Sequence, residues 1–310
     1  MMDISFIIVN WNTKDLLQDC LQSIVKTVGG IRYEIIVVDN ASVDGSAMML
    51  KDEWPAVKCI ANKENRGFGA ANNQGFHIMT GRYALLLNTD TVLTDHAVMK
   101  LFTFMESHPE TAIACGQLLN ADGSKQNSIA HFPTLLTLLA NTSLLEYLLP
   151  DKFPSKRYEY QAPIEIDSAI GACMIVRKKA IDDVGMFDEQ YFFFFEETDL
   201  AYQMRGAGWK IFHLPDAFIY HLQGQSIGHN IRSRVEFYKS RYRFFKKWER
   251  PFYYRVVCLV IIFRLGINWL LTSLAALVTL GLNADIRSKW IVYSRLLLIH
   301  IQSGEQELRP

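Results

Sequence analysis

The stretch Tyr83–Asp90, with the sequence YALLLNTD, decides the fold of this chain. It is an apolar run that ends abruptly in the polar tip Asn88, Thr89 and Asp90. A continuous apolar run between polar residues predicts a strand of a parallel sheet that is covered on both faces. Because ligands bind at the carboxyl ends of such strands, Asp90 is a candidate binding residue. The alternative is an aspartate that only caps a turn or a helix.

Strand and helix patterns alternate along the first 90 residues. Apolar runs predict the strands, and the segments between them predict helices. The predicted strands are Ile4–Val9, Ile31–Val38, Val57–Ala61 and Tyr83–Leu87, and the predicted helices are Thr13–Val28 with Thr13 as cap, Ser46–Glu53 and Ala70–Thr80. This order predicts an α/β fold with a doubly wound, mostly parallel sheet and right-handed crossovers.

The turn after the first strand argues against two common classes of nucleotide-binding enzyme. It reads Asn10-Trp11-Asn12, where a Rossmann dehydrogenase has a GxGxxG fingerprint. The sequence also lacks a GxxxxGK[ST] phosphate loop. A Rossmann dehydrogenase and a P-loop enzyme are therefore disfavoured.

The composition predicts one large domain with an appendage. Of 310 residues, 50% are hydrophobic, and 32 basic residues balance 32 acidic ones, which argues against nucleic acid as a partner. The five cysteines are scattered without CxxC pairing and predict buried thiols in a reducing compartment. The N-terminal segment has no basic region, and Ile4–Val9 is too short for the apolar core of a signal peptide. We therefore expect the catalytic domain to stay in the cytosol.

Two further acidic sites accompany Asp90. Asp39 follows the second predicted strand, and the segment 196–199 (EETD) follows the aromatic run Tyr191–Phe195. Three acidic sites in one chain suggest a charged substrate and a metal. A carboxylate beside an apolar wall has a raised pKa, which suits general base catalysis. The alternative is an acidic first helical turn, which the helix dipole stabilises. On that helix positions 196 and 199 share a face, whereas 197 points elsewhere.

Two more segments allow both a functional and a structural interpretation. The glycines of Asn65–Gly75 precede a predicted helix, where a diphosphate or ribose can approach the backbone, or where a tight turn is followed by close packing. His221 follows the strand-like run Ala217–Tyr220 and is either a structural histidine or a residue that completes an oxygen-rich site with Asp90.

In this order and spacing the motifs resemble the family 2 glycosyltransferases of the GT-A fold, particularly bacterial rhamnosyltransferase-like members that build surface polysaccharides. The resemblance covers residues 3–245. It rests on segments 9–12 (VNWN), 38–42 (VDNAS), 65–75, 87–90 (LNTD), 171–173 (GAC) and 196–200 (EETDL), on Arg205, Gly208 and Trp209, and on 221–226 (HLQGQS).

The resemblance implies a site for a nucleotide sugar in the N-terminal half. Asp39, together with the segment around Val9, Asn10 and Asn12, is expected to hold the base and ribose, since a carboxylate accepts the imide N–H of uracil or thymine. The expected contacts to the nucleotide or its diphosphate are Arg66, Asn73 and Asn88. Asp90 is expected to bind Mg²⁺ or Mn²⁺, and His221 is expected to contact the metal or a phosphate. The metal would neutralise charge that grows on the departing nucleoside diphosphate.

The catalytic base of such enzymes is usually the second acid of a Glu-Asp pair, which corresponds to Glu197. This chain departs from the family pattern there, with Glu in place of Asp, and at Thr89, where relatives often have Pro. The longer side chain leaves two options: the acceptor sits differently, or Glu196 or Asp199 shares the role. The implied reaction is an inverting displacement without a covalent sugar intermediate.

The C-terminal part differs in composition from the rest of the chain. We expect a catalytic domain over residues 1–245 and basic, apolar helices over 246–310. Basic and aromatic residues crowd Arg232–Arg255, and an apolar stretch, Val256–Leu282, follows. Its segment Leu265–Leu282 is about 27 Å long as a helix, slightly less than a bilayer core of about 30 Å. A second apolar stretch is Trp290–Ile301.

This pattern favours attachment to anionic lipids on the cytoplasmic side of the cell membrane, either peripherally or through residues 256–282. The alternative is an apolar hairpin that packs on the catalytic domain or forms an oligomer. The leucine-rich segment Leu135–Leu149 faces the acceptor or membrane, or simply packs in a core.

The expected activity is metal-dependent transfer of a sugar, rhamnose being one option, to a saccharide or polyprenyl-linked acceptor. The donor is a dTDP- or UDP-linked sugar, because Asp39 serves thymine and uracil equally. Two other classes remain: a catalytically inactive sugar-nucleotide-binding or scaffold protein, and a nucleotidyltransferase. The second should carry a Gly-rich, basic triphosphate loop near the N-terminus, and Asn10-Trp11-Asn12 is not one.

Overall fold

The computed structural model describes residues 2–155, 158–222, 231–280 and 282–302 of the chain. By its contacts the chain divides into two units. The first consists of Met1–Phe132 and Leu149–Gly228, and the second of Pro133–Leu148 and His229–Pro310. The domain boundary expected at 245 falls inside helix α9 (Ile231–Trp248), and the second unit also includes a segment from the middle of the chain.

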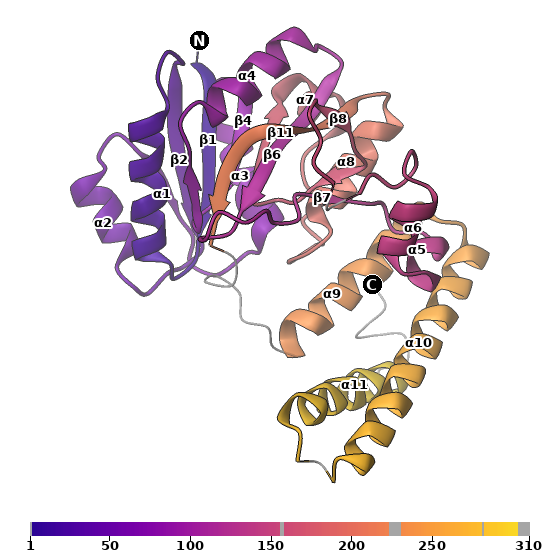
Figure 1. Cartoon of the computed structure of the whole chain (residues 1–310). Helices are drawn as coiled ribbons and strands as arrows, with labels where there is room; N and C mark the ends of the chain where they lie inside the picture. Colours follow the sequence, from indigo (N-terminus) through magenta and orange to yellow (C-terminus); the bar gives the residue numbers. More distant parts are fainter. Residues whose placement is uncertain (1, 156–157, 223–230, 281, 303–310) are drawn as a thin grey trace. The chain divides into compact units, whose positions relative to one another are not determined.

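The first unit is built on a nine-stranded sheet with the strand order β3-β2-β1-β4-β10-β6-β11-β5, and β8 pairs with β11 (Figure 1). Its strands are β1 Met2–Asn10, β2 Tyr33–Asp39, β3 Lys58–Ala61, β4 Gly81–Asn88, β5 Thr91–Leu93, β6 Thr111–Leu119, β8 Ile164–Glu165, β10 Cys173–Arg177 and β11 Lys210–His221. A separate pair consists of β7 Ile129–Ala130 and β9 Ser168–Ala169.

The predicted doubly wound, mostly parallel sheet is confirmed. Strands β1, β2, β3 and β4 are mutually parallel, as the alternation of strands and helices required. Strand β10 lies antiparallel between β4 and β6, and β5 and β8 are antiparallel to β11. The apolar run of β10 shows burial on both faces but carries no information on strand direction.

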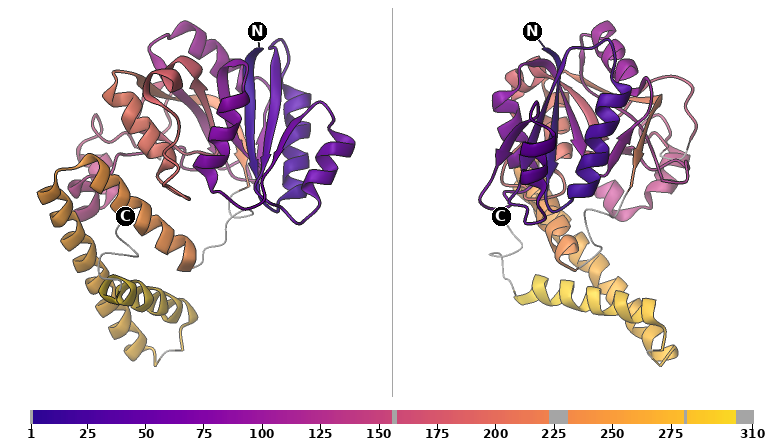
Figure 2. Two further views of the ribbon diagram at one scale, coloured as in Figure 1. Left: turned by 180° about the vertical axis from the view of Figure 1, so that it is seen from behind. Right: turned by 90° about the vertical axis from the view of Figure 1, so that its left-hand side faces the viewer.

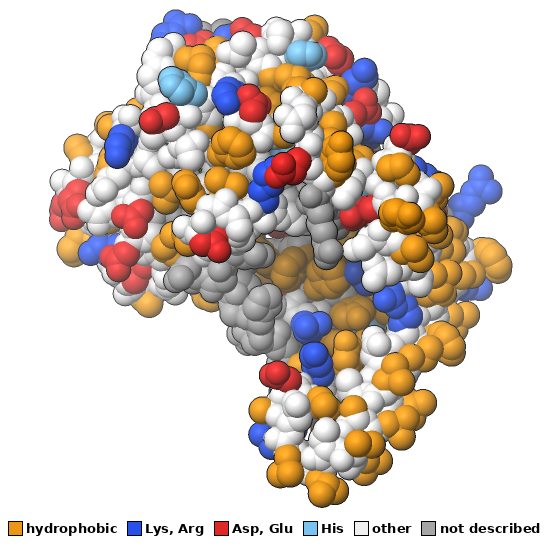
Figure 3. Space-filling view, viewed as in Figure 1, with side chains coloured by type: hydrophobic (Ala, Val, Ile, Leu, Met, Phe, Trp, Pro, Cys, Tyr) orange, Lys and Arg blue, Asp and Glu red, His pale blue; other side chains and the backbone are white. Residues whose placement is uncertain are grey.

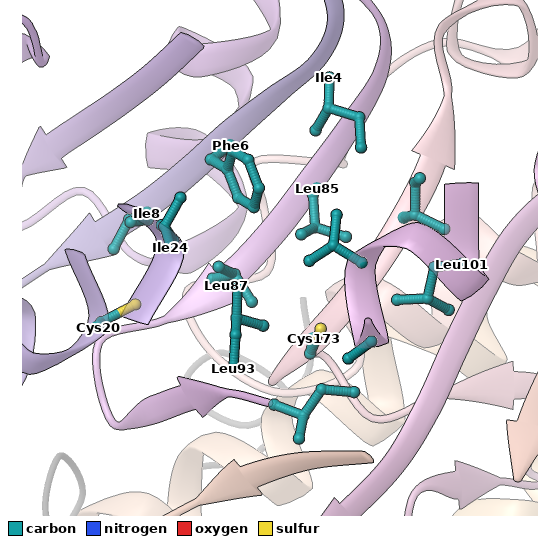
Figure 4. Close-up of a cluster of buried hydrophobic side chains, with 14 of the residues drawn as sticks. Ile4, Phe6, Ile8, Cys20, Ile24, Leu85, Leu87, Leu93, Leu101 and Cys173 are labelled. Atoms are coloured by element: carbon teal, nitrogen blue, oxygen red, sulfur yellow. The ribbon is translucent and has the colours of Figure 1, made fainter. Parts of the chain in front are cut away.

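Helices cover both faces of this sheet (Figures 1 and 2). They are α1 Lys14–Thr27, α2 Ser46–Glu53, α3 Phe68–Ile78, α4 Ala97–Ser107, α7 Lys178–Val184 and α8 Glu196–Gly206. Side chains alternate along a strand, so Phe6 and Ile8 join the buried cluster under α1, α2 and α4 (Figure 4), whereas Ile7 joins the cluster under α3, α7 and α8. Because β1, β2 and β4 are parallel, their carboxyl ends lie at the same edge of the sheet.

The second unit is helical in its described part. Its helices are α5 Leu135–Leu139, α6 Thr142–Leu148, α9, α10 Pro251–Val278 and α11 Ala284–Gln302. Leu138 of α5 is buried with Tyr242 and Phe245 of α9, Ile261 of α10 and Leu296 of α11. The leucine-rich segment therefore contributes to a core, which was one of the two expectations for it. Five of its leucines are nevertheless exposed: Leu136, Leu139, Leu144, Leu148 and Leu149.

The apolar helix α10 is longer than the sequence suggested. It has 28 residues and is therefore about 42 Å long at 1.5 Å per residue. The helix begins at Pro251, and proline is a favoured first helical residue. It is long and apolar enough to cross a membrane by length and composition. Hydrophobic side chains are prominent on the visible surface of the second unit (Figure 3).

All five cysteines are free thiols. Four of them are buried, as predicted, but Cys59 is exposed because it lies on β3, at the edge of the sheet.

Two glycines explain why the segment before α3 is glycine-rich. Gly67 has φ +85°, and a Cβ atom there would lie 2.4 Å from the carbonyl oxygen of Phe192. A Cβ atom on Gly69 would lie 3.2 Å from Cβ of Phe187. The backbone N–H of Phe68 donates a hydrogen bond of 3.1 Å to Phe192 O. The structure thus shows the close-packed turn of the two interpretations, and this packing fixes the segment that leads into α8.

We expect Gly67→Ala to destabilise the first unit and displace the start of α8. The backbone region around φ +85° and ψ 172° is nearly restricted to glycine and costs about 1–3 kcal/mol for other residues, to which the clash with Phe192 adds. Gly185→Ala is the matched control, since Gly185 has φ +98° and ψ 179° but nothing within 4 Å of its Cβ position. Thermal unfolding should show a clearly larger loss for Gly67→Ala, and equal losses would contradict the close packing.

Candidate active site

Polar side chains end three neighbouring strands of the sheet. Asn10 at the end of β1 pairs in register with Asp39 at the end of β2. On the other side of β1, Val9 pairs with Asn88 at the end of β4. Parallel strands bring their carboxyl ends to one edge, so three of the predicted site segments meet there.

Asp39 is held by its neighbours in this edge. Its side chain is 2% exposed, and its Oδ1 accepts a hydrogen bond of 2.7 Å from Nδ2 of Asn10. Its Oδ2 accepts one of 3.0 Å from the backbone N–H of Ser42. Asn12 Oδ1 accepts a bond of 2.7 Å from Val43 N–H, so the two turns after β1 and β2 are joined. A carboxylate keeps further lone pairs, which leaves Asp39 able to accept from a ligand.

Thr13 connects the turn after β1 with the turn after β4. Its hydroxyl lies 2.8 Å from Asn10 Oδ1 and 2.8 Å from the hydroxyl of Thr89. Because the amide oxygen only accepts, Thr13 donates to Asn10 and accepts from Thr89. Thr13 is the N-cap residue of α1, as predicted, but its side chain makes no cap hydrogen bond to the helix. Thr89, the departure from the family pattern, therefore fastens the turn that carries Asp90.

Asp90 and His221 lie together, as the sequence suggested. Both are buried, and Nε2 of His221 lies 3.4 Å from Oδ1 of Asp90. Nδ1 of His221 lies 2.9 Å from Oε1 of Gln126. The amide Nε2 of Gln126 donates to the carbonyl oxygen of His221 and, at 2.7 Å, to Oδ1 of Asn120. Its Oε1 is therefore an acceptor, and Nδ1 of His221 must be the donor to it.

This hydrogen bond orients His221 for a cation. With Nδ1–H donated to Gln126, a neutral imidazole directs the lone pair of Nε2 towards the carboxylate of Asp90. Two acceptor atoms that face each other at 3.4 Å suit a shared cation. Adjacent ligands of an octahedral Mg²⁺ with bonds of about 2.1 Å lie about 3.0 Å apart, close to this separation. Among the described residues no group of three His, Cys, Asp or Glu side chains could hold a metal.

The two glutamates at the start of α8 are in apolar surroundings. Phe194 and Phe195 both have positive φ, and the chain turns sharply there into the helix. Glu196 is 4% exposed, and burial together with the charge of Glu197 raises its pKa well above the usual value. Burial raises the pKa of Glu197 to about 7. Among the described residues, Oε2 of Glu196 has no hydrogen-bond partner.

Asp199 lies one helical turn further on, at the buried face of α8. Its Oδ1 accepts a hydrogen bond of 3.2 Å from the Tyr191 hydroxyl, and its Oδ2 accepts one of 2.8 Å from Gln203 Nε2. These bonds tie the aromatic run to the helix. The three acids thus differ in environment, as the spacing along a helix predicted.

A short segment places Glu197 near the end of β4. A Cβ atom on Gly171 would lie 3.8 Å from Cγ of Glu197, so the glutamate stem passes directly over this glycine. The next residue, Ala172, accepts a hydrogen bond of 2.9 Å from the backbone N–H of Asn88. Glu197 and Asn88 therefore both contact the segment 171–172.

Arg66 and Asn73 lie beside each other, and both contact Glu189. Arg66 pairs with Glu189 at 3.3 Å in an exposed ion pair. Asn73 is buried, and its amide donates to Phe187 O at 2.9 Å and accepts from Phe187 N–H at 3.0 Å. Exposed ion pairs contribute little to stability, so Arg66 can exchange Glu189 for a ligand phosphate. Asn73 fixes the segment that precedes α8, and a direct contact with a nucleotide stays a prediction.

Sequence reasoning missed the contacts that three residues make in this site. Gln126 orients His221 from 95 residues away, and no motif marks it. Gly171 and Ala172 were part of a motif, but their contact with Glu197 and Asn88 follows only from the folded chain. Residues 223–226 of the motif that begins at His221 lie outside the described residues.

Comparisons with known proteins show the family to which the chain belongs. The model of the family "Glycosyl transferase family 2" matches residues 5–185. The chain is 24% identical over 225 residues to the N-acetylglucosaminyl-diphospho-decaprenol L-rhamnosyltransferase of Mycobacterium tuberculosis (strain CDC 1551 / Oshkosh), which covers 68% of this chain and 73% of that protein. It is 26% identical over 208 residues to the low-salt glycan biosynthesis hexosyltransferase Agl10 of Haloferax volcanii, which covers 66% of this chain and 62% of that protein.

A solved structure shows a similar fold. The crystal structure of GalNAc-T7 with UDP, GalNAc and Mn²⁺ matches 71% of this chain and 43% of that chain, with a TM-score of 0.55 and 15% identity. The chain belongs to glycosyl transferase family 2, has the GT-A fold that the resemblance implied, and is a glycosyltransferase.

We expect the pH dependence of sugar transfer to follow Glu197. A general base acts only when ionised, and with a pKa of about 7 its ionised fraction rises about tenfold between pH 6 and pH 8. The rate should therefore rise with pH across this window. Stability should change in the opposite direction: an acid whose pKa is raised on folding contributes stability below its usual pKa, and that contribution is lost as pH rises through 7.

Glu197→Gln should abolish transfer while leaving donor binding nearly intact. Glu110→Gln is the control, since Glu110 is an exposed acid on the same unit. Transfer rates and nucleotide binding should be measured side by side. If Glu197→Gln retained turnover and the pH profile, another group would be the base.

Proposed function

We propose that this enzyme transfers a sugar from a dTDP- or UDP-linked donor, with inversion, to a lipid-linked or saccharide acceptor in cell-surface glycan synthesis. The observation that carries the proposal is the position of Glu197, whose pKa is raised, beside the segment 171–172. The same segment contacts the end of β4, and Asp90, just after that strand, lies close to His221. The named activities of the rhamnosyltransferase and hexosyltransferase relatives support it.

Asp39, Asn10 and Asn12 are proposed to hold the base and ribose. Asp39 is fixed by Asn10 and Ser42 and retains lone pairs for the imide N–H of thymine or uracil. Trp11 beside them is 51% exposed, and its ring can stack on a base. Arg66 completes the proposed contacts, since it can move from Glu189 to the diphosphate.

Asp90 and His221 are proposed to hold Mg²⁺ or Mn²⁺, with Gln126 fixing the imidazole. Carboxylate oxygen suits both ions, and imidazole suits Mn²⁺ better than Mg²⁺. When bound, such an ion neutralises charge on the leaving diphosphate. The presence of Mn²⁺ in the similar GalNAc-T7 structure supports this assignment.

Glu197 is proposed to act as the general base. Its carboxylate takes the proton of an acceptor hydroxyl as that oxygen forms a bond to the anomeric carbon. The bond from the anomeric carbon to the diphosphate breaks on the opposite face of the sugar, so one displacement inverts the configuration. Glu196 and Asp199 are less suited, because Glu196 is almost fully buried and both oxygens of Asp199 accept hydrogen bonds from side chains.

The second unit is proposed to bind a membrane surface through α10. Seven of the exposed apolar side chains of α10 lie on one face of the helix and form a stripe: Phe252, Leu259, Phe263, Ile267, Leu270, Leu274 and Leu277. The buried residues Val257, Ile261 and Leu265 lie on the opposite face. A helix with such a stripe suits the plane of the membrane interface. A spanning orientation would place Arg264 near the bilayer centre, which is costly.

Thermal stabilisation by nucleotides tests the function. UDP, dTDP or their sugars, with Mn²⁺, should raise the unfolding temperature, because a ligand at a hundredfold excess over its Kd stabilises the native state by about 2.7 kcal/mol. EDTA or Asp90→Asn should remove the metal-dependent part. If no nucleotide shifts the unfolding of the folded protein, the scaffold alternative is favoured. Binding of a nucleotide sugar without turnover would favour an inactive binding protein.

Flotation with phosphatidylglycerol vesicles tests the membrane contact. Phe263→Glu should greatly reduce the bound fraction, because it places a charge in the stripe of α10. Val43→Glu is the matched control, since Val43 is 91% exposed but belongs to the first unit. Unchanged binding of Phe263→Glu would contradict the proposed surface.

A further inference from the structure

A polar pocket lies within the second unit, among helices that are otherwise apolar. It has a volume of about 340 Å³, within the usual range for small-ligand sites. Asn141 lies between α5 and α6, and Thr142 is the first residue of α6. Helix α9 contributes Arg241, and α10 contributes Arg264 and Asn268. The catalytic mechanism uses none of these residues.

Arg241 is a half-buried cation in this pocket. Its guanidinium lies 4.4 Å from the ring centre of Phe237 and 5.6 Å from that of Tyr238. Within the described residues, its Nε is buried without a hydrogen-bond partner. Burial lowers the pKa of Arg241, and the nearby charge of Arg264 lowers it further. A buried N–H donor without an acceptor is unfavourable, so an acceptor in the pocket would satisfy it.

The pocket offers positive charge and hydrogen-bond donors but no counter-charge. None of the side chains that line it is acidic. The described part of the chain shows no ion pair between a carboxylate and either Arg241 or Arg264. Two guanidinium groups and the amides of Asn141 and Asn268 suit an oxyanion with several acceptor atoms, such as a phosphate or diphosphate.

The surroundings indicate that this anion carries an apolar chain. Arg264 lies on α10, between the stripe that is proposed to contact the membrane and the buried face of the helix. Arginine at such a flank lies at the depth of lipid phosphates when the stripe rests in the interface. A phosphate on a lipid can therefore reach the pocket while its hydrocarbon stays beside α10.

We propose that this pocket binds the phosphate or diphosphate group of the polyprenyl-linked acceptor and so holds the acceptor lipid on the second unit. This inference rests on the proposed function for the identity of the lipid. An anionic phospholipid headgroup presents related chemistry and is distinguished by experiment. The pocket would give the enzyme a preference for acceptors with a lipid phosphate over the free saccharide.

Binding of farnesyl diphosphate to the full chain in a neutral detergent tests the proposal. Arg264→Gln should weaken binding about tenfold or more, as expected for the loss of a charge-assisted hydrogen bond. Arg255→Gln is the matched control, because Arg255 is exposed on the same helix, half a helical rotation away, and does not line the pocket. Arg241→Lys, which keeps the charge, should weaken binding less than Arg241→Gln.

Three results would overturn the proposal. Equal weakening by Arg264→Gln and Arg255→Gln would show general charge attraction. Binding of phosphatidylglycerol vesicles that depends on Arg264, without binding of farnesyl diphosphate, would assign the pocket to a phospholipid. Binding of inorganic diphosphate as tight as that of farnesyl diphosphate would remove the role of the apolar chain.

The outcome is separable from that of the proposed transferase function. Farnesyl diphosphate binding requires no turnover, and nucleotide binding is measured independently on the same variants. Arg264→Gln should keep the thermal shift with UDP or dTDP. If nucleotides failed to bind while farnesyl diphosphate bound in an Arg264-dependent way, the transferase assignment would fail and the lipid phosphate site would stand.

Discussion

The parallel pairing of β1 with β2 and with β4 is the constraint on which the site depends. It places Asn10 beside Asp39 and Val9 beside Asn88, and a slip of one residue would turn every side chain of β1 to the other face of the sheet. Burial of Phe6 and Ile8 under one helical layer and of Ile7 under the other prevents that slip. Packing energy far from the ligand thus determines where the polar strand ends meet.

At the start of α8, by contrast, the arrangement that suits the proposed chemistry lowers the stability of the folded chain. Two adjacent carboxyls are held in apolar surroundings, where ionisation is unfavourable. The close contact of Gly67 with Phe192 and the bonds of Asn73 to Phe187 keep this segment in place despite that cost. A carboxyl group that is difficult to ionise gives a carboxylate that is a stronger base. The cost to stability and the proposed catalytic role therefore have the same cause, the apolar surroundings.

Much of the first unit could be predicted from the sequence, because continuous apolar runs and the polar residues after them are local signals. Asp39, Asp90 and Glu196–Asp199 all follow such runs. The direction of β10 could not be predicted, because an apolar run indicates burial but not whether a strand is parallel or antiparallel to its neighbours. Gln126 could not be found either, since a hydrogen bond across 95 residues leaves no local pattern. Thr89 looked like a departure from the family, and only its bond to Thr13 shows a purpose.

The second unit is discontinuous in sequence, and this has a practical consequence for dissecting the protein. Leu138, from the middle of the chain, is buried against Tyr242, Phe245 and Ile261 from its last third. A fragment that ends before α9 would keep α5 but lose the side chains that cover Leu138. Shortening the chain to make it easier to handle would thus uncover apolar surface, and self-association of such a fragment would reflect a severed core.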